Sequence, residues 1–367
     1  MEENLEFDDK IEDNEITEIP QEVRKITTQA YDKSVADIVR MIEDGDINLN
    51  PEYQRNYIWD NKKSSLLIES LILNVPIPVV YVSQELDDSW TVIDGLQRLN
   101  SLYRFFQRDF KLGGLEILNE LNKSDIKTLN PKALRVLKNG LLRIIVISQD
   151  SHPEIKYDVF MRLNTGAVKL NDQELRNCLY RGKLNEAVRE IAKKESFLNL
   201  FNLEEPHKRM ADCELILRFL SLYSNYNSED NTINNYKGRM KNFINNYLIV
   251  NSKIDDEKVE DLKSLASDVS DTIIEVYTTN AFKRFNSEGL YESTLNRSIM
   301  DMLFVSTAVL DRSKIIANKE AIFERFKYLM MNDLEFKNSI TIGTSDTKVL
   351  NYRIDKWVNE IKTILNA

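Results

Sequence analysis

Apolar residues follow two different patterns along this chain. In its first part, short apolar runs typical of β-strands occur at 79–83, 90–93 and 141–148. Apolar residues three or four apart predict helices from Ser34 to about 43, from Asp60 or Asn61 to before Pro76, and over 96–107. Beyond residue 165 helical spacing recurs at 213–223, 243–250, 299–310 and 354–365. We therefore expect an α+β protein, with a small α/β domain followed by a mostly α-helical domain.

Three segments follow from this change of pattern. Residues 1–27 are acidic and poor in aromatic residues, which predicts a disordered tail. Residues 28–165 form the predicted α/β domain, and residues 166–367 form the predicted helical domain. Within the helical domain, the Asn-rich stretch 225–235 is expected to be a loop.

The formal charge of −10 is concentrated in the tail. Residues 1–24 contain ten acidic and two basic residues, so the remainder carries a net charge of only −2. A nearly neutral body can have a local basic cleft, and the overall charge does not exclude nucleic acid as a partner. The tail is expected to be a solubilising segment, with DNA mimicry as the alternative.

Several functional classes lack their sequence signatures here. No apolar run approaches the roughly 18 residues of a membrane span, and the acidic first residues are unlike a signal peptide. The two cysteines, Cys178 and Cys213, have no CxxC spacing and indicate a reducing compartment, so we expect a cytoplasmic protein. No P-loop occurs, and two histidines, His152 and His207, are too few for a His-based metal site. We predict no protein-held metal centre.

The run Asp94-Gly95-Leu96-Gln97-Arg98 joins a predicted strand to a predicted helix. Helix N-terminal N–H groups attract phosphate, and an arginine can bind phosphate in bidentate fashion. The alternative is an ordinary turn with Asp94 as the helix N-cap.

A second cluster, rich in aromatic residues, precedes the helix that begins at Asp60 or Asn61. It comprises Tyr53, Gln54, Arg55, Tyr57 and Trp59. Gln and Arg can contact phosphates or base edges, and aromatic rings can stack on bases. Alternatively, the rings pack in the core and Arg55 forms an ion pair.

Two later clusters also combine arginine with amide or carboxyl groups. Arg162, Asn164 and Thr165 precede a glycine turn, and Glu174, Arg176 and Asn177 follow in a helix capped by Asn171 or Asp172. They fit a binding cleft or simply the capping of helices. The stretch 208–218 is expected to be structural, with Glu214 and Arg218 as a helix pair.

Taken in order, four blocks resemble the GmrSD-type family, also called domain of unknown function 262. They are Gln54-Arg55-x-Tyr57-x-Trp59, the segment 67–78 with its two prolines, Ile93-Asp94-Gly95-x-Gln97-Arg98-Leu99, and 160–166 followed by 174–177. The first domain of that family is similar to the ParB and sulfiredoxin fold and has an Asp-Gly-Gln-Gln-Arg motif. The resemblance covers about residues 30–220.

This resemblance implies a role in bacterial defence against phage, in a restriction system that recognises modified DNA. It also implies that a nucleoside triphosphate, with Mg²⁺, is bound and hydrolysed. Carried onto this chain, Asp94, Gln97 and Arg98 would be catalytic. The nucleotide-binding residues would be Gln54, Arg55, Gly95, Arg162, Asn164 and Thr165.

Two departures from the family pattern shape the hypotheses. Leu96 replaces the first Gln of the motif, and the chain lacks the HNH nuclease domain of many relatives, so a separate nuclease subunit would cut DNA. The leading hypothesis is a sensor and NTPase subunit. The alternatives are a non-catalytic nucleotide- or DNA-binding module that recruits a nuclease, and a ParB-like enzyme that itself nicks DNA.

Overall fold

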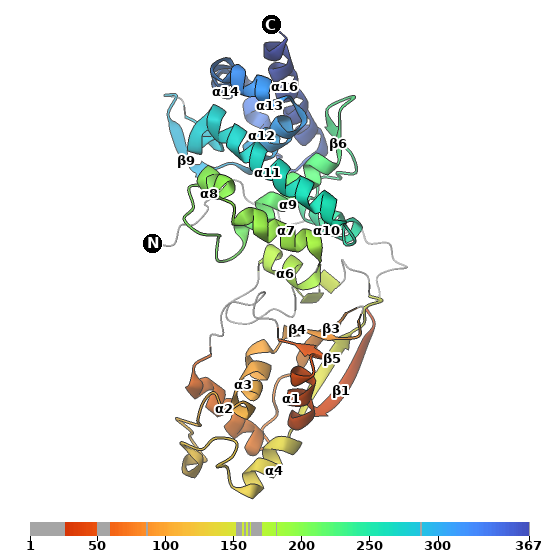
Figure 1. The fold of residues 1–367 in the computed structure, drawn as a ribbon, viewed down its shortest axis with the longest axis vertical. Helices are drawn as coiled ribbons and strands as arrows, with labels where there is room; N and C mark the ends of the chain where they lie inside the picture. The colour runs from red at the N-terminus through yellow and green to blue at the C-terminus, as the bar shows by residue number, and fades with distance from the viewer. Residues whose placement is uncertain are drawn as a thin grey trace. The chain divides into compact units, whose positions relative to one another are not determined.

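The computed structural model describes residues 26–49, 59–85, 87–151, 156–157, 159–160, 162, 171–180, 182–286 and 288–366. These residues form two compact units. We call the part up to Leu179 the sheet unit and the part from Tyr180 onward the helical unit (Figure 1). Residues 163–170 and nearly all of the acidic tail lie outside the described residues. The division predicted at residue 165, like the disorder of the tail, stays a prediction.

The sheet unit is built on one five-stranded sheet. Its strands are β1 (Thr28–Ser34), β2 (Ile47–Asn48), β3 (Val80–Gln84), β4 (Trp90–Asp94) and β5 (Leu141–Ile147), in the order β1-β5-β3-β4-β2. Strand β3 runs parallel to β5 and antiparallel to β4, so it lies at the centre of the sheet. Along the first part of β5, buried Leu142 and Ile144 alternate with the exposed Leu141 and Arg143, as expected for a sheet covered on one face, and Val146 and Ile147 at its end are both buried.

Helices α1 to α4 cover that face of the sheet (Figure 1). The helices and the short 3₁₀ turn of this unit are α1 (Val35–Glu43), α2 (Asn61–Ile72), α3 (Leu96–Phe106), η2 (Asn119–Leu121), α4 (Pro131–Asn139) and α6 (Asp172–Leu179). The side chain of Ser34 accepts the Asp37 N–H, and Asp60 accepts the Lys63 N–H, so both predicted N-caps are confirmed. Apolar side chains of α1, α2, α3 and α4 meet those of β3, β4 and β5 in one core.

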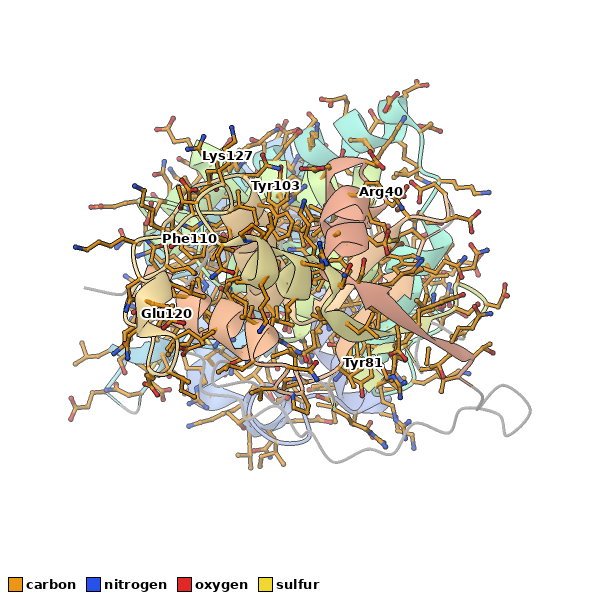
Figure 2. The ribbon with its side chains drawn as sticks, turned by 90° about the horizontal axis from the view of Figure 1, so that it is seen from below. Arg40, Tyr81, Tyr103, Phe110, Glu120 and Lys127 are labelled. Carbon is orange, nitrogen blue, oxygen red and sulfur yellow. The ribbon has the colours of Figure 1, made fainter. Side chains whose placement is uncertain are left out.

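One buried carboxylate fastens the segment between α3 and α4, on which Figure 2 labels Phe110, Glu120 and Lys127. Glu69 of α2 is 4% exposed and accepts the backbone N–H groups of Glu116, Ile117 and Leu118 at 3.2, 2.8 and 2.7 Å. Burial by itself raises the pKa of Glu69, but the three N–H donors outweigh it and hold this pKa below its usual value. The carboxylate therefore stabilises the folded segment in its ionised form.

The helical unit contains most of the remaining chain. Its elements are α7 (Lys183–Ala192), α8 (Glu195–Phe201), α9 (Ala211–Ser224), β6 (Tyr226–Asn227), β7 (Thr232–Ile233), α10 (Met240–Val250), α11 (Asp256–Tyr277), η3 (Thr278–Asn280), β8 (Lys283–Phe285), β9 (Tyr291–Leu295), α12 (Arg297–Val309), α13 (Arg312–Ala317), α14 (Lys319–Asn332), α15 (Leu334–Ser339) and α16 (Thr347–Leu365). Helix α12 is the centre of this unit, because its residues from Ser298 to Thr307 are all buried. The predicted α+β class is confirmed.

The Asn-rich stretch is a β-hairpin, so the predicted loop over 225–235 is wrong. Strands β6 and β7 pair antiparallel, and α16 holds the hairpin through polar side chains. Asn231 donates to Asp355 at 2.8 Å, and the Ile233 N–H donates to Asn351 at 3.0 Å. These partners lie more than a hundred residues away in the sequence, which local turn signals cannot reveal.

We predict that Glu69→Gln lowers the free energy of unfolding by about 2 kcal/mol at neutral pH, because a neutral amide is a weaker acceptor for three buried N–H groups. The folded-state pKa of Glu69 is lowered. Its contribution is therefore fully present above the unfolded value of about 4.3 and is lost as the pH falls through the folded-state pKa. Urea unfolding of both proteins at neutral pH and near pH 3.5 measures this difference.

The exposed Glu120, changed to Gln, is the matched control and should leave stability nearly unchanged. An equal loss in the two variants, or a loss for Glu69→Gln that does not shrink in acid, contradicts the role of the buried carboxylate.

Candidate nucleotide site

The turn from β4 into α3 depends on a glycine. Gly95 has a φ of 101°, in the left-handed region that disfavours side chains. A Cβ atom there would stand 2.9 Å from Cγ2 of Val80 and 3.3 Å from Nη2 of Arg98. Because the backbone passes so close to β3, the carboxylate of Asp94 and the first turn of α3 lie at the same corner of the sheet.

Arg98 joins the two sides of this corner. Its Nη2 donates to Oδ2 of Asp94 at 2.8 Å, and its Nη1 donates to the carbonyl oxygens of Pro78 and Val79, the latter at 3.3 Å. The Arg98 side chain is 11% exposed, whereas that of Asp94 is 43% exposed. In this structure the guanidinium thus binds the two residues that precede β3, and the Asp94 carboxylate beside it is partly exposed to solvent.

The first turn of α3 presents backbone N–H groups without a side-chain cap. The N-cap is Gly95, which has no side chain to accept from them. The first hydrogen bond along the helix runs from the Leu99 N–H to the Gly95 carbonyl at 2.9 Å. The N–H groups of Leu96, Gln97 and Arg98 therefore have no acceptor within the helix, as at any helix start. The alternative prediction, a turn capped by the Asp94 side chain, is wrong.

Leu96 is a core residue. Its side chain is 9% exposed and belongs to the apolar cluster between the sheet and its helices. The position where the family motif has its first Gln thus faces the interior in this chain. The leucine adds apolar contact at the start of α3, and the polar groups of the corner come from its neighbours.

Gln97 connects the corner to the aromatic cluster predicted from the sequence. Its Oε1 accepts the backbone N–H of Trp59 at 3.3 Å. The Trp59 side chain is half-buried, and its ring packs against the core of the sheet unit. Tyr53, Gln54, Arg55 and Tyr57 lie outside the described residues.

The third predicted cluster is described in part. Arg162 is exposed, and Asn164 and Thr165 lie outside the described residues. Asn171 and Glu174 form a reciprocal capping box at the start of α6, with N–H to side-chain bonds of 2.8 and 2.7 Å. This confirms Asn171 as the cap.

Two further predicted residues of α6 are buried. Arg176 is 1% exposed and donates to Gln173 at 3.2 Å, and Asn177 is also buried. Glu174 and Arg176 are thus buried and hydrogen-bonded to α6 or its N-cap, and Asn177 is buried on the same helix.

In the stretch 208–218, Arg218 binds Asp301 of α12 through Nε and Nη2 at 3.0 and 2.6 Å. The charge of Glu214 also acts on Arg218, as expected for the predicted helix pair. The bidentate partner Asp301 was not predicted. Cys213 is a free, buried cysteine, and burial raises the pKa of its thiol, which disfavours the reactive thiolate. The Cys178 side chain lies outside the described residues.

Sequence reasoning missed the acceptors that hold Arg98. The carbonyls of Pro78 and Val79 have no side-chain signature, although the proline pair Pro76 and Pro78 marks an extended segment with free carbonyls. It also missed Val80, whose contact explains why position 95 must be glycine.

The described residues provide one exposed carboxylate for a cation at this corner, that of Asp94. Mg²⁺ is commonly held by one or two carboxylates together with substrate phosphates, so the corner fits a magnesium ion that arrives with a nucleotide. Within the described ranges, no three His, Cys, Asp or Glu side chains gather into a metal site of their own. None of the described helices is long and apolar enough to cross a membrane.

Comparison with known proteins identifies the segment that carries this corner. Residues 35–181 match the family described as GmrSD restriction endonuclease, N-terminal domain. Among solved structures, a Pnob8-like ParB-N domain aligns with 13% identity over 93% of this chain and 99% of that chain, at a TM-score of 0.23. At that TM-score the superposition carries no argument. No curated protein matches the chain.

We predict that Gly95→Ala lowers the free energy of unfolding by about 1–3 kcal/mol, because the new Cβ would occupy a strained φ and press on Val80. Gly113→Ala is the matched control, since a Cβ at Gly113 meets nothing within 4 Å. Thermal or urea unfolding compares the two variants. Equal stability of both would contradict the close approach of Gly95 to β3.

Proposed function

Because residues 35–181 match the GmrSD N-terminal domain, we propose that this chain is the sensor and NTPase subunit of a bacterial restriction system directed at modified DNA. A domain of this family suggests a role in restriction. In the proposal, hydrolysis of a nucleoside triphosphate licenses cleavage by a separate HNH-type nuclease. The observation that carries it is the corner where Gly95 brings the uncapped start of α3 beside Asp94 and Arg98.

Phosphate binding is the first step of the proposal. The N–H groups of Leu96 and Arg98, which have no acceptor within the helix, lie in the first turn of an eleven-residue helix, where the helix dipole favours an anion. Arg98 lies one turn further and can bind the same phosphate once it leaves the Asp94 carboxylate. The phosphate and the carboxylate then compete for one guanidinium.

This competition supplies a means of activating Asp94. While Arg98 binds it, Oδ2 of Asp94 accepts a charged hydrogen bond at 2.8 Å. When a phosphate draws the guanidinium away, that oxygen becomes available to orient an attacking water or to bind the Mg²⁺ of the nucleotide. Positioning and charge neutralisation are the main requirements of phosphoryl transfer, and both can come from these residues.

Gln54, Arg55, Arg162, Asn164 and Thr165 complete the proposed nucleotide site. The chain connection supports Gln54 and Arg55. They precede Trp59 by only a few residues, and the backbone N–H of Trp59 donates a hydrogen bond to Gln97. Arg55 is four residues before Trp59, so its Cα lies within about 14 Å of the Trp59 Cα. A long arginine side chain on that tether can reach a nucleotide at the corner.

A non-catalytic module that binds nucleotide or DNA and recruits the nuclease is the second candidate function. The observation that favours it is the burial of Leu96, which leaves the motif with one fewer polar side chain than its relatives. Tight nucleotide binding without phosphate release distinguishes this function from the first.

A ParB-like nickase is the third candidate, and it uses the same corner. If Asp94→Ala still nicks DNA in the presence of a divalent metal ion, the corner is not the source of that activity.

We predict that the purified chain releases phosphate from at least one of ATP, GTP, CTP and UTP, with or without DNA, and that Arg98→Ala abolishes this release. The guanidinium neutralises the phosphate charge in the transition state, a contribution typically worth about 10³-fold or more in rate. Arg40→Ala is the matched control, because Arg40 of α1 is exposed and should leave the rate unchanged.

Circular dichroism and thermal unfolding must show that Arg98→Ala remains folded, since the residue also binds two carbonyls. Asp94→Asn provides a second variant of nearly identical shape and should also lose phosphate release. Turnover at the wild-type rate in folded Arg98→Ala contradicts the proposal.

A further inference from the structure

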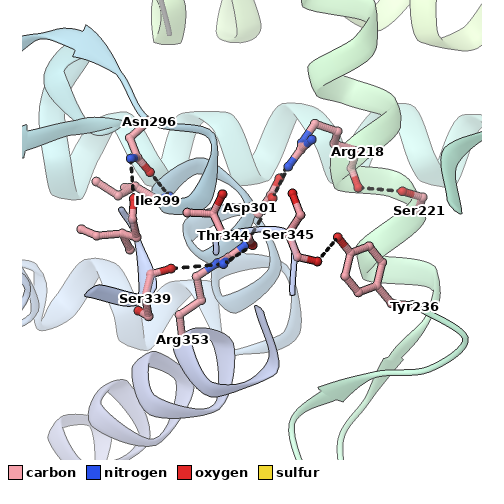
Figure 3. A network of polar contacts seen from close by, with 11 residues as sticks. Arg218, Ser221, Tyr236, Asn296, Ile299, Asp301, Ser339, Thr344, Ser345 and Arg353 are labelled. Carbon is pink, nitrogen blue, oxygen red and sulfur yellow. Dashed lines mark hydrogen bonds and ion pairs between the residues drawn. The ribbon is translucent and has the colours of Figure 1, made fainter. Parts of the chain in front are cut away.

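The helical unit contains a buried charge cluster at its centre (Figure 3). Asp301 of α12 is fully buried and binds Arg218 at 2.6 Å, while Nη2 of Arg353, in α16, lies 3.8 Å from the same oxygen. Arg353 is 1% exposed. Buried charges require partners, and here two guanidinium groups share the Asp301 carboxylate, while the charge of Glu214 also acts on Arg218. The cluster therefore fixes both arginines within the core.

The same cluster holds the segment between α15 and α16, which we call the 339–346 loop. Arg353 donates to the carbonyls of Ser339 and Thr344 at 3.3 and 2.8 Å. Tyr236 donates its O–H to the Ser345 carbonyl at 2.9 Å. Burial raises the pKa of Tyr236 to about 12, so this O–H remains a donor. Buried side chains thus draw the carbonyl groups of this loop inward.

Inward carbonyls leave N–H groups on the other side of the loop. Across a planar trans peptide the C=O and the next N–H point in opposite directions, so the Ser345 N–H points away from the Thr344 carbonyl. Among the described residues, none accepts a hydrogen bond from the N–H of Gly343, Thr344 or Ser345. Gly343 has a φ of 57°, and a Cβ built there would meet nothing within 4 Å. The loop therefore offers unpaired donors on an open surface.

Lysines from three elements flank these donors. Lys237 precedes Gly238, where a Cβ would stand 3.5 Å from the Ser345 carbonyl oxygen. The backbone carbonyl of Lys337 accepts a hydrogen bond from the Thr341 hydroxyl at 2.9 Å. Lys348 lies in the first turn of α16. All three lysines are exposed, and within the described ranges none forms an ion pair.

The nearest loop carboxylate is used locally. Asp346 accepts the N–H groups of Lys348 and Val349 at 2.7 and 3.4 Å, as the N-cap of α16. Glu335, two residues before Lys337, interacts with Tyr352 of α16. The three lysines thus exceed the two carboxylates Asp346 and Glu335 around the 339–346 loop. This local excess contrasts with the formal charge of −10 on the whole chain.

We propose that the 339–346 loop, together with Lys237, Lys337 and Lys348, contacts the phosphodiester backbone of DNA. Backbone N–H groups, hydroxyls and lysines are the usual phosphate ligands, and they carry no sequence information. Cations from three elements match a polyanion better than a single phosphate. The inference takes only its partner class from the proposed function and needs no nucleotide hydrolysis.

The test is fluorescence anisotropy of a labelled 30-base-pair duplex of arbitrary sequence, titrated with the full-length chain at several salt concentrations. The variant Lys237→Gln/Lys337→Gln/Lys348→Gln should lower affinity roughly tenfold or more at low salt. It should also reduce the slope of log K against log salt by about 2–3, close to one unit per lost phosphate contact.

The matched control is Lys253→Gln/Lys258→Gln/Lys314→Gln, which removes the same charge from exposed lysines elsewhere in the helical unit. Tyr236→Phe keeps every lysine and releases the Ser345 carbonyl. We expect it to weaken binding about fivefold, the equivalent of one net hydrogen bond. Thermal unfolding verifies that each variant is folded.

Equal affinities and slopes for the two lysine variants overturn the proposal, as does a wild-type chain that fails to bind the duplex. Wild-type affinity in Tyr236→Phe overturns the assignment of contact to the loop. Binding of ATP and of inorganic phosphate is measured alongside. A loss confined to these small ligands overturns the choice of DNA. Phosphate release is assayed separately, so the DNA-binding result can be interpreted even if the NTPase proposal fails.

Discussion

The sheet unit depends on one close approach. At Gly95 the chain passes so near β3 that a Cβ atom would stand 2.9 Å from Val80. This approach turns the end of β4 into the start of α3 without a side-chain cap, and it lets Arg98 reach the carbonyls that precede β3. A larger residue at position 95 would separate these parts. The carboxylate, the helix start and the guanidinium would then no longer share one corner.

In each unit an arginine with little exposed surface binds backbone carbonyls, Arg98 in the sheet unit and Arg353 in the helical unit. Arg98 binds two carbonyls at the edge of the central strand while its second contact, Asp94, stays open to solvent. Arg353 binds two carbonyls of a surface loop from within the core. In the first case the carboxylate partner is partly open to solvent, and in the proposed function a phosphate displaces it from the arginine. In the second case the arginine is enclosed in the core beneath the loop.

Local pattern predicted the elements around the corner closely. The strands expected at 79–83 and 90–93 are β3 and β4 to within one residue, and the helix expected over 96–107 is α3. These elements bury a regular face, and their turns contain Gly and Pro, so the sequence carries both signals. Strand β1 was not predicted, because this edge strand is mostly exposed and has no apolar alternation.

The site itself could be predicted only in its residue types. The motif indicated Asp94 and Arg98, but their contact with each other and with the Pro78 carbonyl depends on the packing of β3. Likewise, Arg218 lies one turn from Glu214 in the sequence, yet its bidentate partner Asp301 is on another helix. Long-range pairs of this kind come from tertiary packing, which a single sequence does not display.

Hydrogen–deuterium exchange with and without a nucleoside triphosphate tests most directly whether the corner binds phosphate. The N–H groups of Leu96 and Arg98 have no acceptor within α3 and should exchange rapidly in the free protein. A phosphate at the corner should slow their exchange while the other helix starts of the sheet unit remain unchanged. Nucleotide binding that leaves these two amides unprotected, or protects only the helical unit, would contradict the assignment of the site.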